Sequence, residues 1–153
     1  MAHPDDVVFH LMRRVLQDHT AGWQTRLPEL TKPQYAVLSV LSSSPGLDQV
    51  TVGARAAIDK STLAGLLNRL EERELITRSS DRADRRRQLL RLTTKGKATI
   101  RAATPVADEV DAAALAPLTA AEQRRLTTLL IKLVGETAPT ATSDPAQPRS
   151  RTQ

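Results

Sequence analysis

Six arginines and two aspartates lie between Arg78 and Arg91, so these fourteen residues carry a net charge of +4. The whole 153-residue chain carries only +5 at pH 7, with 22 Lys and Arg against 17 Asp and Glu. A guanidinium group forks onto two phosphate oxygens and fits a narrow groove better than an ammonium group does. This local charge favours nucleic acid as the partner of the segment.

A run of leucines over residues 63–70 precedes the arginines, with the i, i+3, i+4, i+7 spacing of a helix that has one apolar face. The residues on or near its polar side are Lys60, Ser61, Thr62, Gly65, Asn68 and Arg69. An α-helix fits the major groove of DNA, where Asn pairs with adenine and Arg binds guanine or phosphate. We expect Asn68 and Arg69 to make such contacts and Gly65 to permit close approach to the DNA.

Both groups also have a purely structural interpretation. The arginine run is then a solvated loop that keeps the chain soluble. In the leucine-backed helix, Gly65 relieves crowding between helices, and Arg69 pairs with Glu72 or Glu71. For any single residue the two interpretations stay open at this point.

Hydrophobic periodicity predicts a mainly α-helical chain with one small β-hairpin. We expect six helices, which run from 5 to 22 or 23, from 31 to about 41, over 50–57, from 61, from 93 or 94, and from 119 to about 135. Capping boxes are expected at Thr31 and Thr119, a serine cap at Ser61, and a bend at Pro105. Two strand-like runs, 75–79 and 88–92, predict a hairpin whose long tip carries the arginines. Residues 138–153 lack apolar periodicity and predict a disordered tail.

Composition excludes several classes of protein. The chain has no cysteine, which excludes disulfides, thiolate zinc sites and thiol-based redox sensing. It has neither an apolar run long enough to span a bilayer nor the basic start of a signal peptide, so we expect a cytoplasmic protein without membrane contact. A glycine-rich phosphate loop is absent, and all three histidines lie within the first 19 residues. We therefore expect no enzyme, no metal site and no cofactor.

A short helix, a tight turn and a second helix, followed by a basic hairpin, is the arrangement of a winged helix-turn-helix. Four segments carry a more specific pattern: Ile58-Asp59-Lys60-Ser61-Thr62-Leu63, Asn68-Arg69-Leu70-Glu71, Asp81-Arg82-Ala83-Asp84-Arg85-Arg86-Arg87 and Leu92-Thr93-Thr94-Lys95-Gly96. With these segments the chain resembles the MarR family of transcriptional regulators over about residues 5–136. One departure is Glu74, where relatives usually have glycine at the end of the recognition helix.

The resemblance implies a homodimer on a pseudo-palindromic operator in double-stranded DNA. Residues 31–97 would form the DNA-binding region, whereas 1–30 and 98–137 would hold the dimer together, with 1–30 also walling a ligand pocket. Each subunit would place its recognition helix in the major groove and its wing in the adjacent minor groove. By the same resemblance Asp84 braces the wing and Arg86 enters the minor groove, where narrow A·T tracts attract arginine. Arg82, Arg85 and Arg87 would lie on or near phosphates.

The only aromatic residues, Phe9, Trp23 and Tyr35, all lie in the first 35 positions. On a helical wheel, His19 falls within the apolar arc beside Trp23, and Arg13 lies at the edge of that arc. A histidine on an apolar helix face is more often a core residue with its hydrogen bonds made within the protein, and an arginine at the edge of that face is more often solvated. The alternative is a pocket with polar groups set in apolar walls.

The segment 11–17 also resembles the branch of the family that responds to small aromatic carboxylates such as protocatechuate or a hydroxybenzoate. By that resemblance, Arg13 grips the carboxylate, with Arg14 as the fallback, and His19 bonds a ring hydroxyl or the same carboxylate. Trp23 and Tyr35 would wall the ring. The sequence therefore predicts a DNA-binding repressor that an aromatic acid releases from its operator. The alternative function is an architectural or protein-interaction winged helix without a small-molecule effector.

Overall fold

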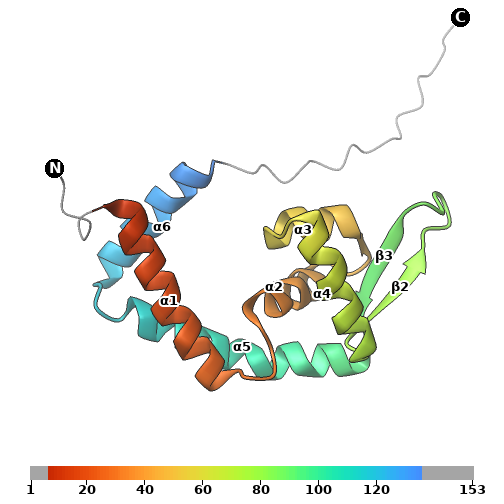
Figure 1. Ribbon diagram of the computed structural model, residues 1–153, viewed down its shortest axis with the longest axis horizontal. Coiled ribbons are helices and arrows are strands. Elements are labelled where there is room, and N and C mark those ends of the chain that lie inside the picture. Colours follow the sequence, from red (N-terminus) through yellow and green to blue (C-terminus); the bar gives the residue numbers. More distant parts are fainter. Residues whose placement is uncertain (1–6, 136–153) are drawn as a thin grey trace, which may run out of the picture. The chain divides into compact units, whose positions relative to one another are not determined.

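The computed structural model describes residues 7–135, and along the chain these divide into two compact units, with the boundary between Leu115 and Ala116. The first unit contains α1 (Val8–Arg26), α2 (Lys32–Ser43), β1 (Leu47–Asp48), α3 (Gln49–Ala56), α4 (Lys60–Glu72), β2 (Ile76–Ser80), β3 (Gln88–Leu92) and α5 (Thr94–Leu115). The second contains α6 (Ala120–Val134). The six expected helices are thus confirmed (Figure 1). The expected disordered tail, 138–153, lies outside the described residues.

Leucine, valine and isoleucine side chains build the main core of the first unit. Leu38 of α2 and Leu67 of α4 are fully buried, and Leu90 in the middle of β3 belongs to the same cluster. Val37 and Leu41 of α2 are also buried, and so are the other leucines of α4, which confirms the helical spacing predicted for residues 63–70. A smaller cluster around Trp23 and Val110 joins α1 to α5. Within residues 7–135, no helix is both long and apolar enough to cross a membrane.

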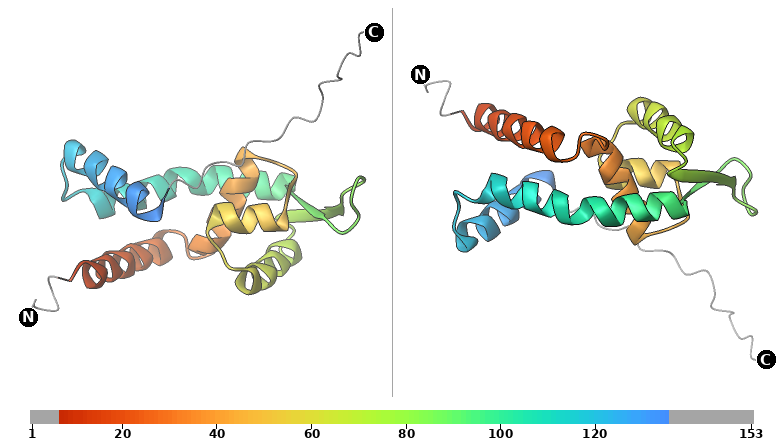
Figure 2. Two further views of the ribbon diagram at one scale, coloured as in Figure 1. Left: turned by 90° about the horizontal axis from the view of Figure 1, so that it is seen from above. Right: turned by 90° about the horizontal axis from the view of Figure 1, so that it is seen from below.

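The sheet has three strands in the order β1-β3-β2, one more than the hairpin predicted from sequence. In β2 and β3, Ile76 pairs with Leu92 and Ser80 with Gln88, so residues 81–87 form the tip (Figure 2). The extra strand β1 contains only two residues and pairs with Leu89 and Leu90 of β3. Two residues are too few to show an alternating pattern, which explains why sequence periodicity missed this strand.

The sequence predicts that helix α1 ends at Gly22 or Trp23, but it continues to Arg26. Glycine within a helix costs about 1 kcal/mol relative to alanine, which tertiary contacts can offset. Here the next residue, Trp23, is 5% exposed and its Nε1 donates a hydrogen bond to the carbonyl of Leu30 at 2.7 Å. These contacts hold the last turn of α1 against the rest of the unit.

The helix caps confirm two expectations and correct a third. Thr31 and Thr119 both form the predicted capping boxes, with Gln34 and Glu122 respectively. The prediction of a cap at Ser61 is wrong, because α4 begins one residue earlier and Asp59 is its cap. Asp59 accepts a hydrogen bond from the backbone N–H of Thr62 at 2.9 Å, and the Ser61 hydroxyl donates to the same carboxylate at 2.7 Å.

Helix α5 runs through Pro105 without a break in its 22 residues. Its first turn is tied to the end of α4 by Thr93, whose hydroxyl donates to the carbonyl of Glu74 at 2.6 Å. The same hydroxyl accepts from the backbone N–H of Gly96 at 2.9 Å. The Leu-Thr-x-x-Gly part of the sequence pattern (Leu92 to Gly96) therefore joins α4, the wing and α5.

Glu74 occupies a backbone position that favours glycine. Its φ is +59°, its N–H bonds to the carbonyl of Glu71, and the N–H of Leu75 bonds to the carbonyl of Leu70. These two bonds form a Schellman motif, which usually has glycine at its left-handed residue. The helix therefore ends in the usual way although Glu74 replaces the glycine of the family pattern, and the consequence of the replacement is a strained backbone at Glu74.

Replacing Glu74 with glycine is expected to raise the free energy of unfolding by about 1 kcal/mol, because a residue with a Cβ is strained at this φ. Glu74→Ala is the matched control, since it removes the carboxylate and its 3.7 Å ion pair with Lys95 but keeps the Cβ. Urea unfolding of the three proteins measures the difference. Equal stability of the Gly and Ala variants would contradict the expectation.

Candidate DNA-binding surface and ligand site

The polar residues predicted on α4 share one exposed face. Lys60, Ser61, Thr62, Gly65, Asn68 and Arg69 are all exposed, while the four leucines of the helix are buried. Asp59 at the N-terminus of α4 accepts bonds from Thr62 and Ser61, and these bonds hold the pKa of its carboxyl well below its usual range. The free backbone N–H groups of this first turn and their positive dipole end also favour phosphate.

Gly65 lies on this face with no atom within 4 Å of the place where a Cβ would stand. The interpretation that Gly65 relieves crowding between helices is therefore wrong. A glycine inside a helix costs about 1 kcal/mol relative to alanine, and nothing within the described chain requires it here. Close approach of DNA at Gly65 stays a prediction, and the open space beside the residue is compatible with it.

Arg78 of β2 links the wing to α4, a role that the sequence reasoning missed. Its Nη2 donates a hydrogen bond to Oδ1 of Asn68, and its Nε lies 3.1 Å from a carboxylate oxygen of Glu71. Glu71 is thus paired with Arg78 rather than with Arg69. The bond from Arg78 of β2 therefore orients the side chain of Asn68 on α4. The contact joins residues ten positions apart on two different elements, so it is seen only in the folded structure.

The wing tip is an ordered loop in which aspartates bind backbone N–H groups. Oδ1 of Asp81 accepts from the N–H of Ala83, and Oδ1 of Asp84 accepts from the N–H of Arg86, each at 3.0 Å. The carbonyl of Asp84 also accepts from the N–H of Arg87 at 2.9 Å. Asp84 therefore braces the wing as expected. Arg82, Arg85, Arg86 and Arg87 are all exposed on this loop, and the side chains of the first three have no hydrogen-bond or ion-pair partner within residues 7–135.

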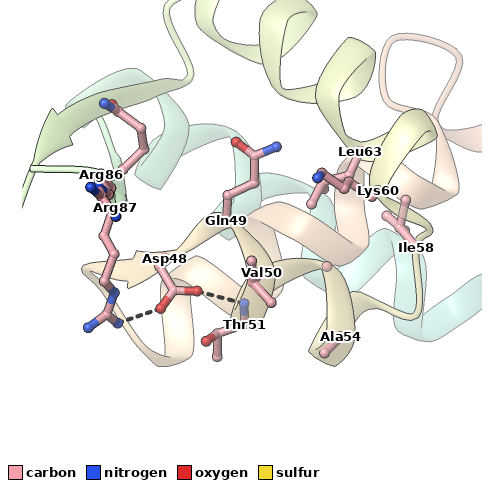
Figure 3. A pocket seen from close by; sticks show the side chains of 12 residues that line it. Asp48, Gln49, Val50, Thr51, Ala54, Ile58, Lys60, Leu63, Arg86 and Arg87 are labelled. Carbon is pink, nitrogen blue, oxygen red and sulfur yellow. Dashed lines mark hydrogen bonds and ion pairs between the residues drawn. The ribbon is translucent and has the colours of Figure 1, made fainter. Parts of the chain in front are cut away.

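Arg87 differs from these three because its guanidinium group is paired within the protein. It donates to Oδ2 of Asp48, while Oδ1 of Asp48 accepts from the N–H of Thr51 at 2.8 Å and caps α3 (Figure 3). The Thr51 and Arg87 bonds lower the pKa of Asp48, and Asp48 in turn raises the pKa of Arg87. Arg87 therefore ties the wing to α3, across a cavity of about 650 Å³ that also reaches Lys60 of α4.

The depressed pKa of Asp59 predicts how stability depends on pH. Such a carboxyl stabilises the folded state above its unfolded pKa of about 3.9, and this contribution is lost as the pH falls towards the folded value. Asp59→Asn is therefore expected to be less stable than the parent at pH 7, and the difference is expected to shrink below about pH 4. Urea unfolding across that range measures it. Asp18→Asn is the control, because Asp18 lies within α1 and caps no helix. A stability difference between Asp59→Asn and the parent that does not change with pH would contradict the expectation.

Three of the predicted ligand residues lie together where α1, α2 and α5 meet. The rings of Trp23 and Tyr35 pack edge to face with centroids 5.1 Å apart, and the His19 ring is 6.1 Å from Trp23. Nε2 of His19 donates to Oδ1 of Asp111 on α5 at 2.6 Å, a contact between residues 92 positions apart that sequence spacing gave no means to find. Nδ1 of His19 is buried and has no hydrogen-bond partner among residues 7–135.

The two predicted arginines lie apart from this cluster in the structure. Arg13 donates from Nη2 to Nδ1 of His10 at 2.9 Å and lines an open groove of about 330 Å³ along α1, with Leu16 and Thr20 among its walls. Arg14 is exposed. The structure therefore brings together His19, Trp23 and Tyr35 and leaves Arg13 on an adjoining face of the same helix.

Comparison with known proteins agrees with this architecture. A family model described as the MarR family matches residues 29–87. The transcriptional regulator HosA of Escherichia coli is 44% identical over 126 residues, which cover 82% of this chain and 93% of HosA.

Two solved structures are similar over most of the chain. The PcaV transcriptional regulator of Streptomyces coelicolor, in complex with its natural ligand, has a TM-score of 0.83 at 39% identity, covering 88% of this chain and 96% of PcaV. Bordetella bronchiseptica BpsR, whose DNA binding is regulated by 6-hydroxynicotinic acid, has a TM-score of 0.84 at 34% identity, covering 88% and 97%. With a winged helix-turn-helix and relatives of this similarity, the chain belongs to the MarR family of DNA-binding transcriptional regulators and is not an enzyme.

Proposed function

We propose that this protein is a homodimeric repressor that binds a pseudo-palindromic operator and leaves it when a small aromatic carboxylate binds. Its place of action would be the cytoplasm, where a bacterial operator lies. The exposed arginines of the ordered wing tip, next to the exposed polar face of α4, are the observation that carries the DNA-binding part of the proposal. A wing held by backbone hydrogen bonds loses little conformational entropy when it enters a groove.

Exposed apolar side chains support a dimer. They occur on α1 and, considered by itself, on α6. On α1, Phe9 is 81% exposed. The large exposed apolar residues of α6 are Leu126, Leu129, Leu130, Ile131, Leu133 and Val134. Contiguous apolar surface of this kind marks an interaction site. We propose that residues 1–30 and 98–137 supply the dimer contact and that residues 31–97 bind DNA.

The effector part of the proposal depends on the cluster of His19, Trp23 and Tyr35. In a neutral imidazole whose Nε2 donates to Asp111, the buried Nδ1 is an acceptor, and a phenolic hydroxyl is a donor that suits it. The relative BpsR responds to 6-hydroxynicotinic acid, which is itself a hydroxylated aromatic carboxylate. We propose protocatechuate or a hydroxybenzoate as the effector, with Trp23 and Tyr35 against the ring and Arg13 or Arg14 on the carboxylate.

The path from effector to DNA would run through α5. His19 and Arg26 of α1 are bonded to Asp111 and Glu109 of α5 respectively, and α5 begins two residues after the wing strand β3 ends. An effector that binds more tightly to one arrangement of α1 and α5 shifts the population towards it. We propose that this arrangement places the two recognition helices of the dimer at the wrong spacing for the operator.

The test is a mobility-shift titration on DNA from upstream of the gene for this protein, repeated with a panel of benzoates and cinnamates. The proposal expects binding to this DNA at least a thousandfold tighter than to random duplex, with release by a hydroxylated benzoate. An architectural module would show almost no such ratio. No release by any aromatic acid in the panel would contradict the effector part alone.

Arg13→Ala is expected to keep the operator affinity of the parent and to lose release by the aromatic acid, since a charged anchor for the carboxylate is removed. Arg14→Ala is the matched control on the next residue of α1. Operator binding as a function of acid concentration measures both variants. If Arg13→Ala is released from the operator at the same acid concentration as the parent, Arg13 does not anchor the carboxylate. If only Arg14→Ala loses this release, Arg14 is the anchor.

A further inference from the structure

A second cavity lies on the first unit at the base of the wing, away from the aromatic cluster. Its volume is about 670 Å³, which is within the range of small-molecule sites. The end of α2, strand β3 and the first half of α5 form its walls. Three cations line it, Arg91 from β3 and Lys97 and Arg101 from α5, and no Asp or Glu is among its lining residues.

The three cations have no ion-pair partner among residues 7–135. Lys97 and Arg101 are four residues apart on one helix, the spacing at which like charges repel and destabilise a helix. Arg91 brings a third positive charge to the same cavity. A cavity lined in this way concentrates positive potential, and an anion bound in it would relieve the repulsion.

The guanidinium group of Arg91 lies against the turn that precedes β1. Gly46 in this turn has a φ of +80°, and its N–H donates to the carbonyl of Leu90 at 3.0 Å. A Cβ on Gly46 would stand 2.8 Å from Nη2 of Arg91, so the guanidinium group lies directly over the glycine. Arg91 is exposed, so its guanidinium group is accessible to a ligand in the cavity.

The rest of the lining is apolar or carries hydroxyl groups. Leu41 and Ile100 are buried residues of the main core that border the cavity, and Pro105 borders it from α5. Ser42 and Thr104 add hydroxyl groups. A simple inorganic ion would leave this apolar surface uncovered, whereas a ligand with a short carbon skeleton would cover it.

We propose that this cavity binds a small organic dianion, a molecule with two negative charges on a short carbon skeleton such as a dicarboxylate or a phosphate monoester. Guanidinium groups bind carboxylate and phosphate oxygens in the same forked geometry, so the two sources share one recognition chemistry. The site is separate from the aromatic cluster, since neither Trp23 nor Tyr35 lines it. It is also separate from the wing tip, because Arg91 and the tip lie at opposite ends of β3.

The experiment titrates the full-length ¹⁵N-labelled protein with adipate and with phenyl phosphate, at constant ionic strength and in the absence of DNA. We expect saturable shifts of the amide signals of Ser42, Gly46 and Thr104 with at least one of the two probes. Hexanoate, which has the carbon skeleton of adipate but one charge, is expected to bind at least tenfold more weakly. The relative affinities of adipate and phenyl phosphate identify the dicarboxylate or the phosphate ester as the better ligand class.

The double variant Lys97→Gln, Arg101→Gln is expected to lose at least tenfold in affinity for the better probe. Lys95→Gln is the matched control, because Lys95 is on the same helix but does not line the cavity. Lack of saturable binding up to about 10 mM of both probes, equal binding of hexanoate, or equal loss in Lys95→Gln would each overturn the proposal. So would a double variant that keeps its probe affinity. If neither probe binds and the double variant loses operator affinity, the cations contact DNA instead, and the proposal is likewise wrong.

Discussion

Gly96→Ala is expected to lower the free energy of unfolding by about 3 kcal/mol or more, the upper end for inserting one methyl group into a packed site. A Cβ on Gly96 would stand 2.0 Å from the carbonyl oxygen of Leu75 and 3.0 Å from its carbonyl carbon. Both atoms belong to the backbone, so no side-chain rotation relieves the clash. The same carbonyl oxygen accepts the N–H of Thr93 at 3.1 Å, and its displacement would also weaken the connection between the wing and α5.

Gly65→Ala is the matched control, because it makes the same chemical change where a Cβ would meet nothing within 4 Å. Alanine is the better helix former, so this variant is expected to gain up to about 1 kcal/mol. Urea unfolding monitored by circular dichroism measures both variants. The expectation is contradicted if the two changes have the same sign. In the operator assay Gly65→Ala is expected to bind more weakly, since its methyl group would occupy the space through which the helix approaches DNA.

Arg86→Ala is expected to weaken operator binding about thirtyfold. The operator meets two wings in the dimer, and a loss of about 1 kcal/mol at each is the lower end for an arginine that contacts bases. The dependence of affinity on salt is also expected to flatten, because two positive charges leave the interface. Mobility-shift titrations at several salt concentrations measure both quantities.

Two further variants separate a direct role of Arg86 from a general effect of charge. Lys95→Gln also removes one positive charge, but from the first turn of α5, and is expected to change operator affinity less than twofold. Arg87→Ala breaks the bond to Asp48 and frees the wing from α3, so it is expected to lower stability as well as affinity. The side chain of Arg86 has no hydrogen-bond or ion-pair partner within residues 7–135, so Arg86→Ala is expected to keep the stability of the parent. Unchanged DNA binding by Arg86→Ala would remove this residue from the site.

The helices and the wing were predictable because their signals are local. The leucine spacing of α4 and the two capping boxes depend on residues three or four positions apart, and the structure confirms each of them. The errors occurred where a local signal was weak or duplicated. Asp59 and Ser61 are both good cap residues two positions apart, and spacing alone does not choose between them.

Local chemistry in the sequence was enough to determine the fold class, the exposed basic hairpin and the family, because apolar periodicity and motif spacing extend over a few residues at a time. Only the tertiary structure decided which of these charged groups remain available to a ligand. It paired Arg87 with Asp48 and Arg78 with Asn68, left Arg86 exposed, and gathered Arg91, Lys97 and Arg101 around one cavity. Each of these outcomes depends on side chains brought together from distant segments, because the energy of a charge is set by its neighbours in space rather than along the chain.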